Sequence, residues 1–377
     1  MLTSLLGIRL ILWIGRAVPV PAPYVVSIAL VRVEVTNDAE TEDGFQLTFT
    51  LGKDPASDYS LLQSRILDPM TKVAIGVLLG TSFETLINGV ITHHQITPSH
   101  EPGLSTLTVM GRDLTLLLDL EDANQEYRNQ PDNVITTRVL TNYIPHGIIP
   151  ATIIPTADIP LELFRIPRQH ETDLQLIQRL AEHNGYVFYL EPIALGVSNA
   201  YWGPDTRIGI PQAPLTLNMG SSTNLTSLNF SNDALAPVST EGRVLELITR
   251  QIVPMPSVPS LRIPPLAREP IRAQRRVQLR QIANRNPAQA AAIASATVSN
   301  APEPVRAEGE LDTVQYGHVL RARRLVGVRG AGSSYNGNYY VQRVTHAIAI
   351  GHQAAIGQYT QQFTLRREGI GAQFPVV

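Results

Sequence analysis

The side chains of this sequence that could bind a metal are the histidines near residue 95. His93 and His94 are adjacent, and His100 follows a few residues later. Neighbouring residues of a strand point to opposite faces, so His93 and His94 cannot comfortably share one zinc ion. The H-E-x-x-H spacing of a helical zinc site is also absent. We therefore interpret these histidines as structural and predict no metal site.

Two groups of carboxylates could in principle cleave glycosidic bonds. Glu40, Glu42 and Asp43 lie together before a glycine. Glu121 and Asp122 follow a Leu-rich segment. Carboxylates gathered at turns are usually solvated, however, and the G-x-S-x-G motif of a hydrolase nucleophile does not occur. We predict no catalytic residues and a protein that is not an enzyme.

The segment GVRGAGSSYNG (327–337) is the nearest approach to a phosphate-binding loop. A dinucleotide-binding loop places its glycines between a strand and the first turn of a helix. Here a strand follows instead, and Asn336-Gly337 is a favoured pair for a tight turn. We interpret the segment as a plain loop within a hairpin and predict no cofactor.

Arginines and tyrosines are the candidates for contacts between subunits. One group of arginines recurs every four residues and would form a basic stripe on a continuous helix: Arg268, Arg272, Arg276 and Arg280. Pro270 interrupts such a helix near its start, and we interpret the stripe as a solvated or intersubunit face rather than a nucleic-acid site. Arg321 and Arg323 share one face of a predicted strand and could line a channel. The complete set that we assign to assembly adds Arg324, Tyr335, Asn336, Tyr339 and Tyr340.

The segment HETDLQLIQRLAEHNGYVFYL (170–190) predicts a helix that runs directly into a strand. Thr172 has the type and position of an N-cap, and Gln175 stands three residues later, as in a capping box. Apolar residues then recur at three- and four-residue spacing on one face. Asn184-Gly185 ends the helix, and the aromatic residues that follow favour a strand. We interpret the unit as scaffolding beside a sheet.

Composition excludes several classes of protein. The chain has 377 residues, 44% hydrophobic and 16% charged, with a net charge of −2, which argues against disorder and general polyanion binding. It has no cysteine, so disulfides, thiolate metal sites and cysteine nucleophiles are excluded. The apolar opening segment is too short to span a bilayer and carries Arg9 in its middle. We interpret that segment as a first strand rather than a signal peptide.

Short strands separated by Gly, Asn-Asp and Pro-Ser turns dominate the chain and predict a mainly β fold with antiparallel sheets. The expected units are an antiparallel sheet closing into a barrel or sandwich in 1–118, a small α+β unit in 119–200, and a second β unit in 201–252 and 309–377. The Leu-rich segment 113–120 and the segment 131–142 are expected to be short helices. Prolines make 253–270 an extended connector, and an Ala/Arg-rich helix is expected at 271–299, within the insertion 253–308.

One internal similarity suggests that the chain carries one barrel twice. NGVITHHQI (88–96) and YYVQRVTHAIAI (339–350) each contain Thr-His and are each followed by a turn and a second strand. The second strands are STLTVMGRD and QYTQQFTLRREG. Both segments therefore predict a hairpin at a corresponding place in two related halves.

Three stretches together resemble the hub proteins of contractile tails, the gpD-like and gp27-like family that includes the N-terminal part of type VI secretion spike proteins. The first is VMGRDLTLLLDLEDANQEYRNQPDNVITTRVL (109–140), and the second is ETDLQLIQRLAEHNGYVFYL (171–190). The third is the terminal block from GHVLRARRLVGVRG to YTQQFTLRREG. The resemblance covers most of the chain in the order of the family.

This resemblance implies a trimer in which each chain carries two antiparallel β-barrel domains similar to the tube subunit, with a small α+β insertion. Such a ring would adapt a six-fold inner tube to a three-fold central spike. The implied partners are further copies of this chain, a separate trimeric spike protein, the inner tube protein and other baseplate proteins. Cargo or a tape-measure protein would be a further partner, and direct nucleic-acid binding is not expected.

The protein would assemble in the bacterial cytoplasm and become a component of a phage tail or a phage-tail-like particle. The sequence ends soon after the terminal block, so the spike is expected to be a separate chain. The alternative, from another class, is an envelope-associated multidomain β protein that binds or cleaves glycans. That alternative predicts a monomer with a carboxylate-lined cleft.

Overall fold

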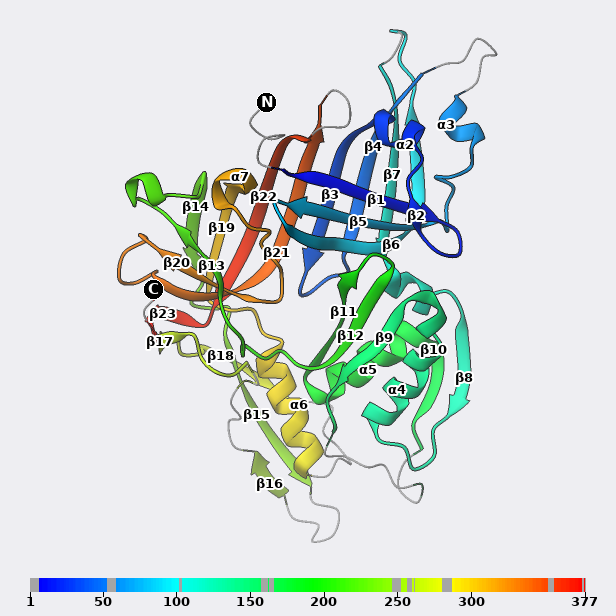
Figure 1. Cartoon of the computed structure of the whole chain (residues 1–377). Coiled ribbons are helices and arrows are strands. Elements are labelled where there is room, and N and C mark those ends of the chain that lie inside the picture. The colour runs from blue at the N-terminus through cyan, green and yellow to red at the C-terminus, as the bar shows by residue number, and fades with distance from the viewer. Residues whose placement is uncertain are drawn as a thin grey trace.

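The computed structural model describes residues 7–52, 59–101, 104–156, 162, 166–245, 252–255, 260, 262–279, 287–351, 356–374 and 376. Strands dominate it, as the sequence predicts (Figure 1). One sheet has 13 strands, and four further sheets have two or three strands each. The described part of the chain is therefore mainly β.

The large sheet has two halves. Strands of the first half are β1 (Arg9–Gly15), β2 (Val20–Pro21), β3 (Leu30–Asp38), β4 (Gly44–Leu51), β5 (Lys72–Leu79), β6 (Ser82–Thr97) and β7 (Ser105–Asp113). Strands of the second half are β13 (Gln212–Thr216), β14 (Ser227–Asn232), β19 (Val305–Asp312), β20 (Leu325–Arg329), β21 (Gly337–Ile350) and β22 (Ile356–Arg367). The strand order is β14-β19-β22-β21-β3-β4-β7-β6-β5-β1-β2, and β13 and β20 branch from β21.

Local sequence explains most of these strands. Along β4 and β7, buried and less buried residues alternate, as expected for strands with one face on a core. Along the first six residues of β5, both faces are buried, which fits the continuous apolar run KVAIGVLL. The segment 25–35 is different: it begins as helix α2 (Tyr24–Ala29) before β3 starts. Pro23 at the N-cap favours this helical turn, and its Val26 is buried in the core.

The two halves repeat one pairing scheme. In the first half the order is β3-β4-β7-β6-β5-β1, and in the second it is β14-β19-β22-β21-β20-β13. A short helix follows the second strand of each half: α3 (Ser60–Gln63) after β4, and α7 (Thr313–Tyr316) after β19. The hairpins β6–β7 and β21–β22 therefore occupy equivalent places. One difference is that β1 pairs antiparallel with β5, whereas β13 pairs parallel with β20.

The pairing corrects one expectation about the barrels. Among the described residues, neither half closes into a ring of strands, and β3 pairs with β21 so that one sheet runs through both halves. The physical reason is that edge strands of the two halves satisfy each other's free backbone groups. Each half still encloses an apolar core of its own, around Phe49 and Ile75 in the first and Val341 and Leu365 in the second.

The α+β unit follows β7 and packs its helices against a three-stranded sheet (Figure 1). Its elements are η1 (Leu114–Leu118), β8 (Asp122–Glu126), α4 (Asp132–Thr141), η2 (Ile144–His146), β9 (Ile148–Ile153), β10 (Arg168–Thr172), α5 (Asp173–Asn184), β11 (Tyr186–Ala194) and β12 (Val197–Pro204). The helix expected at 131–142 is confirmed as α4, and that at 113–120 is a shorter 3-10 helix. Trp202 is buried in the core between α5 and the sheet.

The caps predicted for α5 are confirmed. The hydroxyl of Thr172 accepts a hydrogen bond from the backbone N–H of Gln175 at 3.3 Å. Gly185 ends the helix at φ 67°, in the left-handed region, and β11 follows at once. The Trp202 indole N–H donates to the Ile177 carbonyl, which ties the sheet to the helix.

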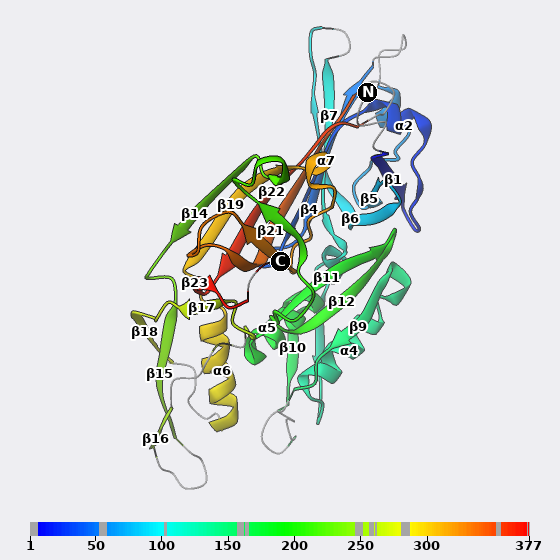
Figure 2. The ribbon, with the colours of Figure 1, turned by 60° about the vertical axis from the view of Figure 1, so that its left-hand side comes forward.

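The insertion between β14 and β19 contains β15 (Val238–Leu245), β16 (Ile252–Met255), β17 (Ala267–Pro270), β18 (Arg275–Gln278) and α6 (Pro287–Ser299). Helix α6 contacts β15 and α5 (Figure 2). The remaining elements are η3 (Gly220–Ser222) and β23 (Gly369–Ala372), which pairs with β17.

The helix expected over 271–299 is wrong in its first part. Residues 275–278 form strand β18, which pairs in parallel with β15. Among the described residues of this segment, those from Pro287 onward are helical. Alanine supplies high intrinsic helix propensity there. Residues 275–278 form a strand because they pair with β15, which overrides the helix propensity of their arginines.

Candidate assembly interface

Two free edges of the large sheet are the strongest candidate site. Eight consecutive strands, β6-β7-β4-β3-β21-β22-β19-β14, pair in antiparallel fashion throughout. Within the described part of the chain, β14 pairs only with β19, so its outer edge is open. Strand β6 pairs with β5 through residues 82–90, and Ile91 forms backbone hydrogen bonds with Met70 and Thr71. Among the described residues, positions 92–97 of β6 pair only with β7. Its outer edge over residues 92–97 is therefore open as well.

The two open edges lie at opposite ends of this eight-stranded face (Figure 1). An open edge presents unpaired N–H and C=O groups and is a template for adding another strand. The edges are unlike each other: β14 has the sequence SLNFSN, and residues 92–97 of β6 have the sequence THHQIT. A contact between them would therefore be head-to-tail rather than two-fold.

The β21–β3 pair shows how two such edges meet inside the chain. Arg343 Nε donates to Asp38 Oδ2 at 2.5 Å across the pair. The hydroxyl oxygens of Thr36 and Thr345 lie 3.1 Å apart on the same face. Seven residue pairs, from Arg343–Asp38 to Ala349–Arg32, stand opposite one another. The junction is thus a regular antiparallel ladder with polar pairs on its outer face.

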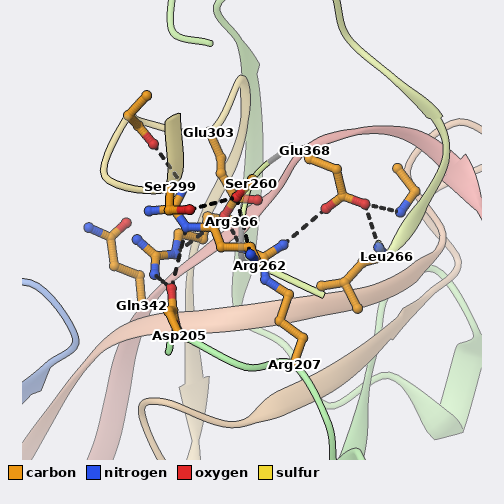
Figure 3. A network of polar contacts seen from close by, with 12 residues as sticks. Asp205, Arg207, Ser260, Arg262, Leu266, Ser299, Glu303, Gln342, Arg366 and Glu368 are labelled. Carbon is orange, nitrogen blue, oxygen red and sulfur yellow. Dashed lines mark hydrogen bonds and ion pairs between the residues drawn. The ribbon is translucent and has the colours of Figure 1, made fainter. Parts of the chain in front are cut away.

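A buried ionic cluster fastens the insertion to the second half (Figure 3). Arg207 binds Glu303 Oε2 at 2.7 Å and Glu368 Oε2 at 3.0 Å. Arg366 binds Asp205 Oδ2 at 2.7 Å. Burial acts to raise the pKa of Glu303, but the surrounding arginines outweigh it and hold that pKa at about 2. The charges are therefore paired within the chain, and the cluster is structural rather than catalytic.

A second polar group lies where the α+β unit meets both halves. It lines a pocket of about 370 Å³, with Asp43, Asp113, Tyr189 and Arg323 among its walls. Arg323 binds both carboxylate oxygens of Asp43, at 2.7 and 3.0 Å, and its guanidinium lies 4.6 Å from the Tyr189 ring centre. Burial, and then the charge of Asp43, raise the pKa of Asp113 to about 7.

Arg321 and Arg323 do not lie on a strand, which corrects the expectation that they share a strand face. Residues 321–324 form a turn before β20, and Arg323 has φ 63°. The reason is the paired hydrogen bond to Asp43, which holds Arg323 inward. Arg321 is likewise engaged within the chain, by Glu84 and the Thr85 carbonyl, and the exposed Arg324 binds Glu191.

The predicted tyrosines are mostly interior. Tyr339 and Tyr340 are buried, so in this conformation they contact their own chain rather than another subunit. Tyr335 stacks on Phe230 with ring centres 4.6 Å apart, and the Asn336 side chain accepts from the Ala331 N–H. The tyrosines are therefore explained by packing within the second half of the chain.

The three described arginines of the predicted basic stripe, Arg268, Arg272 and Arg276, are exposed and do not share a helix. Arg268 and Arg276 form surface ion pairs with Glu269 and Glu241. Arg272 is exposed, and Arg280 lies outside the described residues. Their assignment to assembly contacts stays a prediction.

Other predicted features fit structural roles. Within the described ranges, no three histidine or acidic side chains gather as metal ligands, and no helix is long and apolar enough to cross a membrane. Glu40 binds Arg366, and Glu42 binds Arg112. The open edges themselves were missed by residue-type reasoning. The signal that could have located them is the internal repeat, because it implies a junction between halves.

Comparison with known proteins gives the fold of the chain. No protein-family model and no curated protein sequence matches it. Solved structures do: the 43 kDa tail protein of prophage MuSo2 from Shewanella oneidensis matches 96% of this chain and 98% of its own, with 16% identity and a TM-score of 0.60. A tail protein from Neisseria meningitidis matches 97% of this chain and 98% of its own, with 12% identity and a TM-score of 0.60.

A third structure links this fold to secretion. The c3393 protein of Escherichia coli matches 92% of this chain and 76% of its own, with 15% identity and a TM-score of 0.53. It is described as a component of the type VI secretion system that is structurally similar to the T4 bacteriophage tail proteins gp27 and gp5. The chain therefore has, over nearly its full length, the fold that these phage tail proteins and a gp27-like secretion component share.

Proposed function

We propose that the protein is the baseplate hub of a phage tail or phage-tail-like contractile particle. In this role it forms a trimeric ring that joins a six-fold inner tube to a three-fold central spike. The observation that carries the proposal is the eight-stranded antiparallel face with two unlike open edges. The fold shared with tail proteins and with a gp27-like secretion component supports the same class of function.

The number of strands in the face favours a ring. Eight is even and every pair is antiparallel, so β14 and β6 run in opposite directions. A second copy can therefore add β6 beside β14 and continue the antiparallel order without interruption. A head-to-tail contact of this kind gives a closed ring when the rotation that relates one copy to the next returns to the first copy after a whole number of steps. Three copies would present six similar halves, which suits a six-fold tube above and a three-fold spike below.

The role is mechanical rather than enzymatic. The hub would seed the first ring of the inner tube, hold a separate trimeric spike protein, and contact other baseplate proteins. We place it in a particle assembled in the bacterial cytoplasm. Its polar clusters serve this role because paired internal charges keep the insertion and the two halves in one arrangement under load.

The first test is the absolute mass of the purified protein in solution by multi-angle light scattering. We expect the mass of three chains, and a larger complex when the spike protein of the same particle is added. A mass that stays at one chain in both samples, and also in the presence of the inner tube protein, would contradict the proposal. A glycan-binding screen would then test the alternative function.

A further inference from the structure

The junction inside the chain also supplies a template for the junction between copies. We propose that β6 of one copy pairs with β14 of the next in the register of β21 with β3, which places His93 opposite Asp233 of the neighbouring copy. This inference rests on the proposed ring. It adds the register and the residues in contact.

The first step is to align β6 with β21 by their bulges. Strand β6 has one irregularity against β7, between Ile91 and His93. Strand β21 has two against β22, and the first of them, between Val341 and Arg343, corresponds to that of β6 because both precede the part of the strand that lies beyond β5 or β20. Aligning the two bulges makes His93 equivalent to Arg343. In this alignment the Thr-His dipeptides of β6 and β21 are shifted by three positions relative to each other. The two halves therefore share their strand pairing rather than these two residues.

Strand β14 is aligned with β3 by tracing directly paired residues from strand to strand across each half. From His93 the opposite residues are Met110, then Gln46, then Glu34. From Arg343 the opposite residues lead in the same number of steps to Asn229 on β14. Glu34 is therefore equivalent to Asn229.

Sequence supports this alignment independently. It places Asn37-Asp38-Ala39, at the end of β3, on Asn232-Asp233-Ala234, at the end of β14. These three residues are identical, although they did not enter the alignment. Asp233 is thus the counterpart of Asp38, the residue that binds Arg343 at the internal junction.

The register of the β21–β3 pair, applied to the open edges of β6 and β14, gives the contact between two copies. Arg343 lies opposite Asp38 within the chain, so its equivalent His93 would lie opposite Asp233 of the neighbouring copy. Within the chain Thr345 lies opposite Thr36, so between copies Gln95 would lie opposite Ser231. In the same way His346 lies opposite Val35, so Ile96 would lie opposite Phe230. Each new pair matches polar with polar or apolar with apolar side chains.

Exposure at the two junctions agrees with this register. Asp38, Val35 and His346 are buried where β3 and β21 meet. Two of their counterparts lie open: Asp233 is exposed, and Ile96 is 37% exposed. The third, Phe230, is partly buried against the core of the second half. Pairing β6 with β14 of another copy would cover these residues as their counterparts are covered. An apolar side chain at an open strand edge is otherwise an aggregation risk.

Cross-linking tests the register directly, because the chain has no cysteine of its own. Directly opposed residues of antiparallel strands have Cα atoms about 4.5–5.5 Å apart, within the range of a disulfide. The variant carrying Gln95→Cys and Ser231→Cys should form intermolecular disulfides and run as a covalent trimer on a non-reducing gel. The matched control carries Gln95→Cys and Ser227→Cys, which places the second thiol on β14 about 13 Å away along the strand.

The outcomes separate the register from the ring. A covalent trimer with Ser231→Cys and none with Ser227→Cys would support the inference. Cross-linking through Ser227→Cys instead, or none from either variant while light scattering shows a trimer, would overturn the register and leave the hub proposal standing. A wild-type protein that stays monomeric, alone and with its partners, would overturn both.

A charge exchange tests the His93–Asp233 pair. Asp233→Lys should weaken self-association at least 10-fold, and His93→Glu should do the same by placing two carboxylates opposite each other. The double variant should recover most of the affinity. The control Asp122→Lys changes an exposed acid of β8 and should leave the association constant unchanged. Equal, additive losses in the double variant would refute the contact.

Discussion

At the scale of single residues, Asp113 should give the protein an unusual dependence of stability on pH. Burial, and then the charge of Asp43, raise its pKa from 3.8 to about 7. Between these values the folded protein keeps a proton that the unfolded chain has lost. The free energy of unfolding should therefore fall as the pH rises from about 4 to about 7.

The variant Asp113→Asn removes this titration while an amide oxygen can still accept from the Thr115 N–H. We expect the variant to exceed wild type in unfolding free energy by about 1–3 kcal/mol at pH 8 and to approach wild type at about pH 4, where the unfolded chain also keeps its proton. Urea unfolding at the two pH values measures the difference. A variant with the same pH dependence as wild type would show that another group titrates instead.

Residue types alone were a poor guide to the assembly site. Arg323 and Tyr340 stand out in the sequence as surface-like side chains, yet one is held by Asp43 and the other is buried. Their partners lie about 280 residues away or in other strands, so no local pattern reveals them. The sequence marks His93 for its possible chemistry, whereas only the strand pairing places it on an open edge.

At the scale of elements, α5 shows where sequence reasoning succeeds. Its N-cap, apolar face and glycine C-cap all act within one or two turns, so the sequence predicts the helix and the strand after it. The predicted helix over 271–299 fails because its Arg-rich part is decided by pairing with β15. Segment 25–35 likewise begins as a helix, although its β-branched residues favour a strand.

The cap of α5 provides a test at this scale. Thr172 accepts from the Gln175 N–H and donates to Asp119 at 2.7 Å, so Thr172→Ala removes two hydrogen bonds. We expect a loss of about 1–2 kcal/mol in unfolding free energy, measured by urea denaturation. Thr172→Ser keeps the hydroxyl and should remain within about 0.5 kcal/mol of wild type. Equal losses in both variants would assign the effect to packing of the methyl group.

At the scale of the whole molecule, the sequence predicts the repeat of two halves but not the strand pairing that joins them. Corresponding hairpins indicate two related halves, and the structure gives both halves the same strand order. The pairing of β3 with β21 joins segments about 300 residues apart, and nothing local in either strand specifies it. The sequence therefore predicts two barrels, whereas the structure has one sheet that is open at both ends.

In the ring that we propose, the internal junction also changes the entropy of formation. In a ring of three chains, half of the contacts between neighbouring halves are already made within a chain. The linked halves meet at an effective concentration that does not depend on how much protein is present. Closing the ring then takes two association events instead of five, and each avoided event spares the loss of translational and rotational freedom. The fused pair should complete a ring at dilutions that would keep six separate halves dispersed.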